Sequence, residues 1–318
     1  MILTATAAAV TAFAAYTGLC AAVAQRFTSA RRRSVDSSDA AAPSPLRPVR
    51  FEARDGHATI AADYLPADAA RGAVVFVHGK DSCRGDELKV PTFALAQAFA
   101  AAGLAVLMID LRGHGRSSRA RLTYGERERF DVLGAVDWLR RQGHQRIGVL
   151  GASMGAASSL MAAADEPAIA ALVADSAFAD FGSMIERQFA RLSRLPRWVL
   201  PGALAIGRAL TGVTLQRVRP LAAAATLAGR PCLVIHSAGD RFVPAADARA
   251  LAEAARAELW ITDSAGHIAS YRAAPAAYEA RVLGFFRQHL IDAPGPRTAR
   301  TPAPVPAAAF NPAELCPA

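Results

Sequence analysis

Short apolar runs alternate with longer amphipathic segments through the middle of the chain. Six runs are apolar on both faces, as buried parallel strands must be, at residues 73–77, 104–109, 147–150, 170–174, 232–235 and 259–262. Two more, at residues 49–54 and 58–65, flank an Asp55-Gly56 turn and predict a hairpin. Helical patterns lie at residues 93–102, 126–142, 154–164, 245–257 and 275–289. The alternation predicts an α/β fold with a doubly wound, mostly parallel sheet of eight strands.

A longer insertion separates the sixth and seventh predicted strands. Its apolar positions recur at helical spacing, at Phe178, Phe181, Ile185, Phe189 and Leu192, with charged residues largely on the other faces. We therefore expect a helical cap at about residues 179–219. Two interpretations of its apolar face stay open: the face packs the cap onto the sheet, or part of it roofs a site and receives an apolar chain.

The first residues of the chain are uncharged. A helix over residues 2–24 would be about 34 Å long, which exceeds a hydrocarbon core of about 30 Å, although its Ala and Thr content makes it a weak membrane helix. A secretory signal is the rival interpretation, because Ala22-Val23-Ala24 resembles an AxA cleavage site. Such signals have a basic segment before their apolar part, and that segment is missing here. Arginines at positions 26 and 31–33 follow, and the positive-inside rule keeps them cytoplasmic. Export of the protein from the cytoplasm is the alternative.

Composition narrows the possible functions. The chain has 318 residues, of which 53% are apolar, so it can bury the core of one full-sized domain. Its net charge of +9 comes from scattered arginines, a pattern that does not predict nucleic-acid binding. The four cysteines, at positions 20, 83, 232 and 316, form no CxxC pair, and no metal-ligand spacing, GxGxxG or Walker motif occurs. We expect no metal and no cofactor.

Gly151-Ala152-Ser153-Met154-Gly155 directly follows a predicted strand and opens an alanine-rich helix. This is the strand-turn-helix setting of the GxSxG nucleophile elbow, where side chains at the two glycine positions would collide with neighbouring backbone. A serine hydroxyl needs a base beside it and a third group that orients the base. Asp240 and His267 each follow a later predicted strand, and the chain order Ser, Asp, His is the one that this elbow uses.

Taken together, these motifs over residues 49–290 resemble the α/β-hydrolase superfamily, and most closely its serine-aminopeptidase-like and membrane-anchored lipase-like members. The other matching stretches are His78-Gly79, Arg112-Gly113-His114-Gly115-Arg116-Ser117, Asp175-Ser176-Ala177-Phe178 and Gly239-Asp240-Arg241-Phe242-Val243-Pro244. The resemblance implies a catalytic triad of Ser153, Asp240 and His267. It also implies an oxyanion hole made by the backbone N–H groups of Met154 and Lys80, which would stabilise charge on the reacting carbonyl oxygen.

Several residues have competing interpretations. Asp81 is the alternative to Lys80 in the oxyanion hole, and Asp110 and Asp175 are rivals to Asp240 as the orienting acid. His78 and His114 are expected to shape the loops around the site. Cys83 is expected to be a packed thiol.

The sequence thus predicts a serine hydrolase that cleaves an ester, thioester or amide through an acyl-enzyme, as a carboxylesterase or lipase-like enzyme on an apolar acyl substrate. A peptidase, an acyltransferase and a non-catalytic scaffold are the alternatives. The expected organisation is an N-terminal membrane anchor or uncleaved signal-like helix (1–25), a linker (26–48), the hydrolase domain (49–290) and a disordered Pro/Ala-rich tail (291–318). Because the uncharged run and the basic residues after it form the expected anchor, removal of residues 1–33 is expected to leave a soluble, active enzyme.

Overall fold

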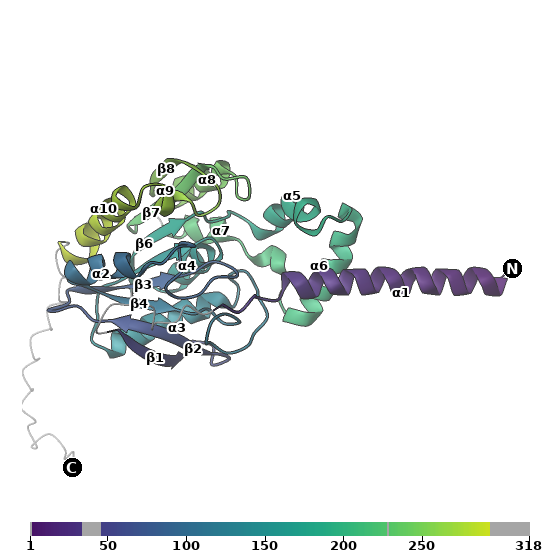
Figure 1. The fold of residues 1–318 in the computed structure, drawn as a ribbon, viewed down its shortest axis with the longest axis horizontal. Helices are drawn as coiled ribbons and strands as arrows, with labels where there is room; N and C mark the ends of the chain where they lie inside the picture. Colours follow the sequence, from purple (N-terminus) through teal and green to yellow (C-terminus); the bar gives the residue numbers. More distant parts are fainter. Residues whose placement is uncertain (1, 34–45, 228, 293–318) are drawn as a thin grey trace, which may run out of the picture.

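The computed structural model describes residues 2–33, 46–227 and 229–292, and it places an eight-stranded sheet at the centre of the domain (Figure 1). The strands are β1 (Arg47–Glu52), β2 (Thr59–Leu65), β3 (Gly72–Val77), β4 (Leu104–Ile109), β5 (Ile147–Ala152), β6 (Ile169–Asp175), β7 (Cys232–Gly239) and β8 (Glu258–Ala265). Their order across the sheet is β1-β2-β4-β3-β5-β6-β7-β8. β2 runs antiparallel to β1 and β4, and the other neighbours are parallel. The predicted α/β fold, with its eight strands, is confirmed.

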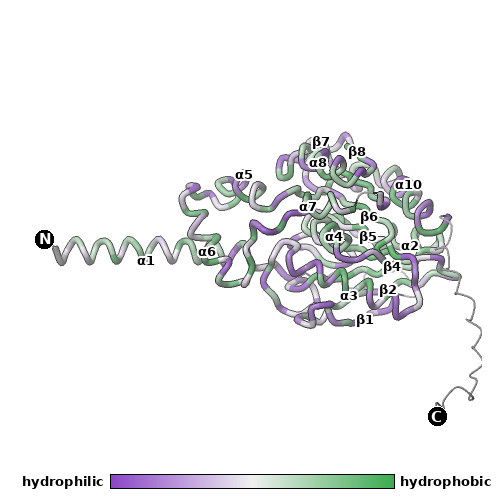
Figure 2. The backbone as a smooth tube through the Cα atoms, turned by 180° about the vertical axis from the view of Figure 1, so that it is seen from behind, coloured by the Kyte–Doolittle hydropathy of each residue, from purple (hydrophilic) through white to green (hydrophobic). Residues whose placement is uncertain are grey.

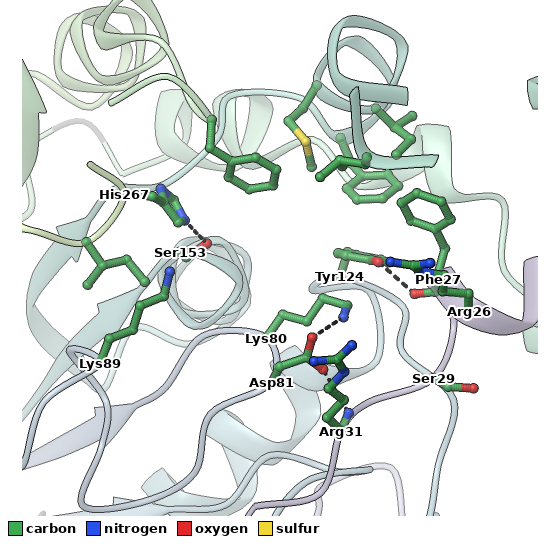
Figure 3. Close-up of a pocket in the computed structure, with 16 residues that line it drawn as sticks. Arg26, Phe27, Ser29, Arg31, Lys80, Asp81, Lys89, Tyr124, Ser153 and His267 are labelled. Atoms are coloured by element: carbon green, nitrogen blue, oxygen red, sulfur yellow. Dashed lines mark hydrogen bonds and ion pairs between the residues drawn. The ribbon is translucent and has the colours of Figure 1, made fainter. Parts of the chain in front are cut away.

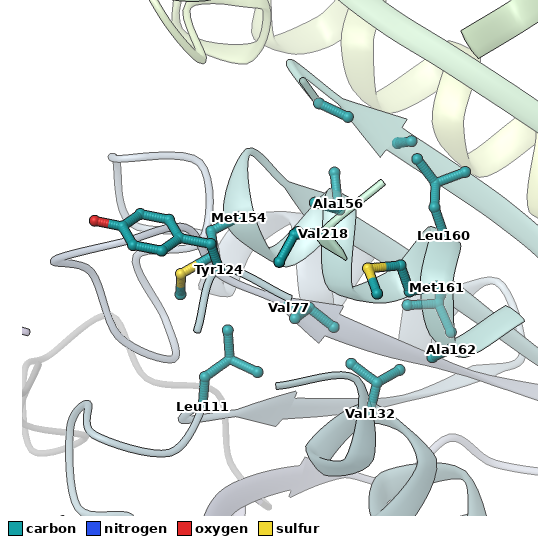
Figure 4. Packing of buried hydrophobic residues seen from close by; sticks show 14 of the residues in the cluster. Val77, Leu111, Tyr124, Val132, Met154, Ala156, Leu160, Met161, Ala162 and Val218 are labelled. Carbon is teal, nitrogen blue, oxygen red and sulfur yellow. The ribbon is translucent and has the colours of Figure 1, made fainter. Parts of the chain in front are cut away.

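Helices cover both faces of this sheet. One face packs against α3 (Glu128–Arg141), α4 (Met154–Asp165), α7 (Pro220–Ala225) and α8 (Ala245–Ala255), and the other against α2 (Phe93–Ala101) and α10 (Pro275–Phe286). Figure 4 shows Leu160 and Met161 of α4 beside Val132 of α3 and Val77 of β3 in the first of these layers. Every residue of β3, β4 and β5 is buried, as a two-sided apolar pattern requires.

The connection from β6 to β7 carries, before α7, the helices α5 (Phe181–Ser193), η1 (Arg197–Val199), α6 (Leu200–Thr211) and η2 (Leu215–Arg217). The first helix begins after Asp180, whose carboxylate accepts a hydrogen bond from the Ser183 N–H at 2.8 Å. It ends at Arg194 in the left-handed conformation, with φ at 61°. In Figure 1, α5 and α6 lie away from the sheet, on the side from which α1 (Ile2–Phe27) extends.

Helix α1 projects out of the domain and packs against it only near its end (Figure 1). Side chains over residues 4–15 are exposed, whereas Cys20 is buried and its Sγ donates to the Val199 carbonyl at 3.6 Å. A Cβ atom at Gly202 of α6 would lie 2.6 Å from Cys20 Sγ, so the glycine permits the close approach of the two helices. Within the described ranges, α1 is the one unbroken helix long and apolar enough to cross a membrane, and Figure 2 shows few hydrophilic residues along its projecting part.

Residues 26–33, at the start of the predicted linker, are bound to the domain. The Phe27 carbonyl accepts from the Tyr124 hydroxyl at 2.6 Å, and the Thr28 carbonyl accepts from the Leu122 N–H at 2.8 Å. The Arg31 N–H donates to Asp81 Oδ1 at 2.8 Å. The expectation of a linker over residues 26–48 therefore needs correction here, because loops of the domain supply partners for backbone groups beyond the end of α1. Most of the remaining linker (34–45) and of the predicted tail (293–318) lies outside the described residues.

Candidate active site

Ser153 lies in a sharp turn between β5 and α4. It has a φ of 51°, a conformation that costs energy for a residue with a side chain. A Cβ atom at Gly151 would lie 2.7 Å from the Gly155 carbonyl oxygen, and one at Gly155 would overlap the carbonyl oxygen of Val77. Both glycines of the GxSxG motif are therefore required by the backbone. The Ser153 N–H donates to the Asp175 carbonyl at 2.8 Å, which ties the turn to β6.

The structure brings together the three residues of the predicted triad. Nε2 of His267 lies 2.7 Å from Ser153 Oγ, and its Nδ1 lies 2.7 Å from Asp240 Oδ2. The second carboxylate oxygen of Asp240 accepts from the N–H groups of Phe242 at 2.8 Å and Val243 at 3.0 Å. In this arrangement the imidazole can take a proton from the serine hydroxyl while the carboxylate holds its other N–H.

Protonation states at the site suit such a transfer. Burial lowers the pKa of His267, and the hydrogen bond to Asp240 opposes this effect only in part, so the ring is neutral near pH 7 and can accept a proton. Burial alone would raise the pKa of Asp240, but its bonds to His267 and to backbone N–H groups outweigh burial and leave that pKa below its usual value. The carboxylate therefore stays ionised beside the imidazole.

The two rival acids are engaged elsewhere. Asp110 forms a buried ion pair with Arg84 and accepts from the Arg116 N–H at 2.8 Å. Asp175 accepts from the Tyr278 hydroxyl at 2.9 Å and from the Ser176 hydroxyl at 2.8 Å, and burial raises its pKa to about 6. Among the three candidates, Asp240 is the one that contacts His267.

Two backbone N–H groups near Ser153 are available as donors. Met154 is the first residue of α4, so its N–H has no acceptor within the helix. In the part of the chain that the structure describes, the Lys80 N–H donates to no other group, whereas the Asp81 N–H donates to His114 Nε2 at 3.2 Å. This difference favours Lys80 over Asp81 as the second donor of the predicted oxyanion hole.

His78 and His114 hold the loops around the site. His78 Nε2 accepts from the Leu111 N–H at 3.0 Å, and the two imidazole rings meet edge to face with their centroids 4.9 Å apart. Burial lowers the pKa of each to about 4, so both are neutral and act as hydrogen-bond partners inside the protein. Cys83 is buried, in agreement with a packed thiol. The described side chains form no cluster of His, Cys, Asp or Glu that could hold a metal ion.

Sequence reasoning missed His236, a buried residue of β7 beside the triad. Its Nε2 donates to the Val243 carbonyl at 3.0 Å and lies 3.7 Å from Asp240 Oδ2. The available signal was its position four residues before Asp240, directly after the apolar run from Cys232 to Ile235. The ring supports the turn that carries Asp240.

A pocket of about 480 Å³ opens beside Ser153 and His267 (Figure 3). One part of its wall is apolar and comes from α5 and the turn after β7, with Phe181, Met184, Ile185, Leu192 and Phe242. The end of α1 and the residues after it add Arg26, Phe27 and Arg31, and the loop from β3 to α2 adds Lys80 and Lys89. The apolar face of α5 was identified from the sequence, but nothing there indicated that the N-terminal segment or Lys89 reaches the site.

Comparison with known proteins agrees with this architecture. The chain is 32% identical over 190 residues to the uncharacterized protein YqkD of Bacillus subtilis, a match that covers 58% of this chain and 62% of that protein. In fold it is similar to an esterase from Pyrococcus furiosus, with a TM-score of 0.68, 22% identity and coverage of 83% of this chain and 98% of the esterase.

A second similar structure is an acylaminoacyl peptidase from Pyrococcus horikoshii, with a TM-score of 0.58, 19% identity and coverage of 77% of this chain and 41% of the peptidase. At these identities both structures show the fold alone. The model of the alpha/beta hydrolase family matches residues 74–281, which include the elbow, Asp240 and His267. The chain belongs to the alpha/beta hydrolase family.

Proposed function

We propose that the protein is a serine carboxylesterase, lipase-like in its preference for apolar acyl chains, that works through an acyl-enzyme while tethered to a membrane. The observation that carries the proposal is the unbroken chain of hydrogen bonds from Asp240 through His267 to Ser153 beside a partly apolar pocket. A hydrolase of this family with an activated serine needs these three groups in contact.

The proposed reaction uses the three side chains and two backbone N–H groups. Ser153 Oγ attacks the ester carbonyl carbon and passes its proton to His267 Nε2, while the backbone N–H groups of Met154 and Lys80 stabilise the negative charge on the carbonyl oxygen. The carbon–oxygen bond to the alcohol then breaks, and the alcohol takes the proton from Nε2. Water repeats the sequence on the acyl-enzyme, with Asp240 holding the imidazolium in both halves.

The apolar wall supports an acyl substrate. Of the residues on α5 that line the pocket, Phe181, Met184 and Ile185 are buried, and Leu192 is half-buried. In this proposal α5 is the part of the cap that roofs the triad and receives the chain. Each methylene buried there should add about 0.8 kcal/mol, or nearly fourfold in kcat/KM, until the pocket is full.

The distribution of exposed apolar residues supports the tether. In the described part of the chain, four large apolar side chains are exposed: Val10, Phe13, Trp198 and Leu210. All four lie on α1, η1 or α6, at the end of the molecule from which α1 projects. In an aqueous environment this grouping would be unfavourable, whereas a bilayer would cover it. The arginines that follow α1 would then hold the catalytic domain on the cytoplasmic side.

A fluorophosphonate probe tests the activated serine directly. It should label the wild type and the control Ser193→Ala, whose hydroxyl instead bonds the Phe189 carbonyl, but not Ser153→Ala. Ser153→Ala and His267→Ala should each lower kcat by roughly 10⁴-fold or more, and the double mutant should be scarcely worse than either. Labelling of the Ser153→Ala variant would refute the assignment.

Chromogenic esters from acetyl to decanoyl, compared with aminoacyl amides and acyl thioesters, test the substrate class. A rise in kcat/KM over several carbons, followed by a plateau, is expected for the esters. Preference for the amides would indicate a peptidase, and a flat ester series would contradict an acyl pocket.

A further inference from the structure

The wall of the pocket that faces away from α5 is strongly basic. Four cationic side chains line the pocket, those of Arg26, Arg31, Lys80 and Lys89, against the single carboxylate of Asp81. That carboxylate already accepts from Lys80 Nζ at 2.6 Å and from the Arg31 N–H at 2.8 Å. With His267 neutral, the lining carries an excess of positive charge, which the Asp240 carboxylate behind His267 offsets only in part.

Lys89 is the cation that faces the reacting groups. Figure 3 shows its ammonium directed toward Ser153 and His267, from the loop between β3 and α2. In the described ranges this ammonium donates no hydrogen bond and forms no ion pair. Its backbone has a φ of 59°, which is unfavourable for a lysine, and its N–H donates to the Asp86 carbonyl at 3.0 Å. The loop therefore places the Lys89 ammonium near Ser153 without a hydrogen-bonding or ion-pair partner among the described residues.

A partly closed pocket with one apolar wall and one cationic wall suits a particular ligand. A neutral ester would leave the cations paired with water alone, whereas an anion beside them gains Coulomb attraction that the walls of the pocket strengthen. Both walls line the same pocket as Ser153, so an ester with its carbonyl at Ser153 has room for its acyl chain against α5 and for its alcohol part beside Lys89.

We propose that the substrate is an anionic amphiphile, an ester whose acyl chain lies against α5 and whose alcohol part carries a phosphate or carboxylate paired with Lys89. The inference rests on the proposed function, because it places the ester carbonyl at Ser153. The bond from Ser153 Oγ to the acyl carbon forms, the bond to the alcohol oxygen breaks, and the alcohol leaves with the proton from His267. Its anion is unchanged by the reaction.

The test compares two octanoyl esters of a nitrophenol that differ at one ring position, where one carries a carboxylate and the other a neutral carboxamide. The measured quantity is the ratio of kcat/KM for the anionic ester to that for the neutral ester, with the full chain in neutral detergent. We expect a wild-type ratio of about five or more at low salt, which falls as salt screens the charges.

Lys89→Gln should lower this ratio about fivefold, and Lys89→Glu should lower it by at least tenfold, because repulsion replaces attraction. The control Arg141→Gln removes one charge at the exposed end of α3, outside the pocket, and should keep the wild-type ratio. Because both esters are measured on the same variant, a partly folded preparation lowers both rates and leaves their ratio intact.

The outcomes separate this inference from the proposed function. A wild-type ratio near one, or a ratio unaltered by Lys89→Glu, overturns the anionic substrate, while Ser153-dependent hydrolysis of the neutral ester keeps the esterase. A chain that hydrolyses neither ester refutes both. Lysophospholipids in the same detergent, with phosphoglycerol or phosphocholine headgroups, identify the source of the anion. If the phosphoglycerol lipid is cleaved faster than the phosphocholine lipid, and Lys89→Glu abolishes this difference, the substrate is a lipid. If the anionic nitrophenyl ester is cleaved selectively and neither lipid is cleaved, the substrate is a small soluble ester.

Discussion

Two N-terminal truncations should behave differently, because α1 has two parts. Residues 4–15 are exposed, whereas the stretch from Tyr16 to Arg33 packs against α6 and then lines the pocket. Removal of residues 1–15 should therefore release the protein from membranes and leave kcat/KM for an octanoyl ester within about twofold of wild type. Removal of residues 1–33, which the sequence predicted to be harmless, should damage both stability and activity.

The size of the damage follows from the contacts that are lost. Cys20, Val23 and Ala24 are buried against the domain, and their burial contributes about 3 kcal/mol. The hydrogen bonds that Phe27 and Arg31 make with Tyr124 and Asp81 contribute about 1 kcal/mol each. The sum of about 5 kcal/mol is a large share of the 5–15 kcal/mol that stabilises a typical domain. The pocket also loses the side chains of Arg26, Phe27 and Arg31, so kcat/KM should fall at least tenfold.

Urea unfolding, followed by tryptophan fluorescence, measures the stability of each form, and ester hydrolysis measures the pocket. Gly202→Leu serves as a variant that deletes nothing, because its side chain would collide with Cys20 and Tyr16 and separate α1 from α6. It should lose stability as the longer truncation does. Wild-type stability and kcat/KM in the form that lacks residues 1–33 would refute the reasoning. Retention of the form that lacks residues 1–15 in the membrane fraction would refute the anchor.

Two further predictions concern the triad and the elbow. The acid limb of kcat/KM should lie below pH 6.5, because burial lowers the pKa of His267. Asp240→Asn should move this limb to still lower pH, because it removes the group that raises the pKa of His267. An acid limb above pH 7 would contradict this. Gly155→Ala should lower the free energy of unfolding by at least about 2 kcal/mol, because the new methyl group overlaps the Val77 carbonyl oxygen. A midpoint of thermal unfolding equal to that of the wild type would argue against so tight a turn.

The fold and the central contacts of the site could be predicted because their signals are local. A strand such as β5 is recognisable from apolar side chains on both faces, and the glycines at 151 and 155 reflect collisions that a sharp turn imposes. Asp240 and His267 were found because each directly follows a strand, and parallel strands bring their carboxyl ends to one edge of the sheet. The convergence of separate strand ends is a property of the fold, so it needed no knowledge of long-range contacts.

The pocket wall could not be predicted in this way. The direction of Lys89 is set by a left-handed backbone within a loop that has no periodic pattern. The position of Phe27 depends on a hydrogen bond to Tyr124, a residue 97 positions later in the chain. Arg26 and Arg31 match the basic flank of a membrane helix, and that pattern is the same whether or not the arginines also line a cavity.

The continuity of α1 links the proposed tether to the proposed substrate. A helix along the bilayer normal needs about 20 residues to cross 30 Å of hydrocarbon, which places the boundary near Ala21 when the span begins at Ile2. Phe27, in the wall of the pocket, is six residues further on, or about 9 Å beyond the boundary, at the depth of the lipid headgroups. Trp198, stacked on Tyr16 with ring centroids 5.6 Å apart, would then lie within the bilayer, on the side nearer the pocket. Arg26 and Arg31 would thus lie at the depth of the headgroups, so an anionic amphiphile can pass from the bilayer beside them and bind with its acyl chain against α5 and its anion beside Lys89.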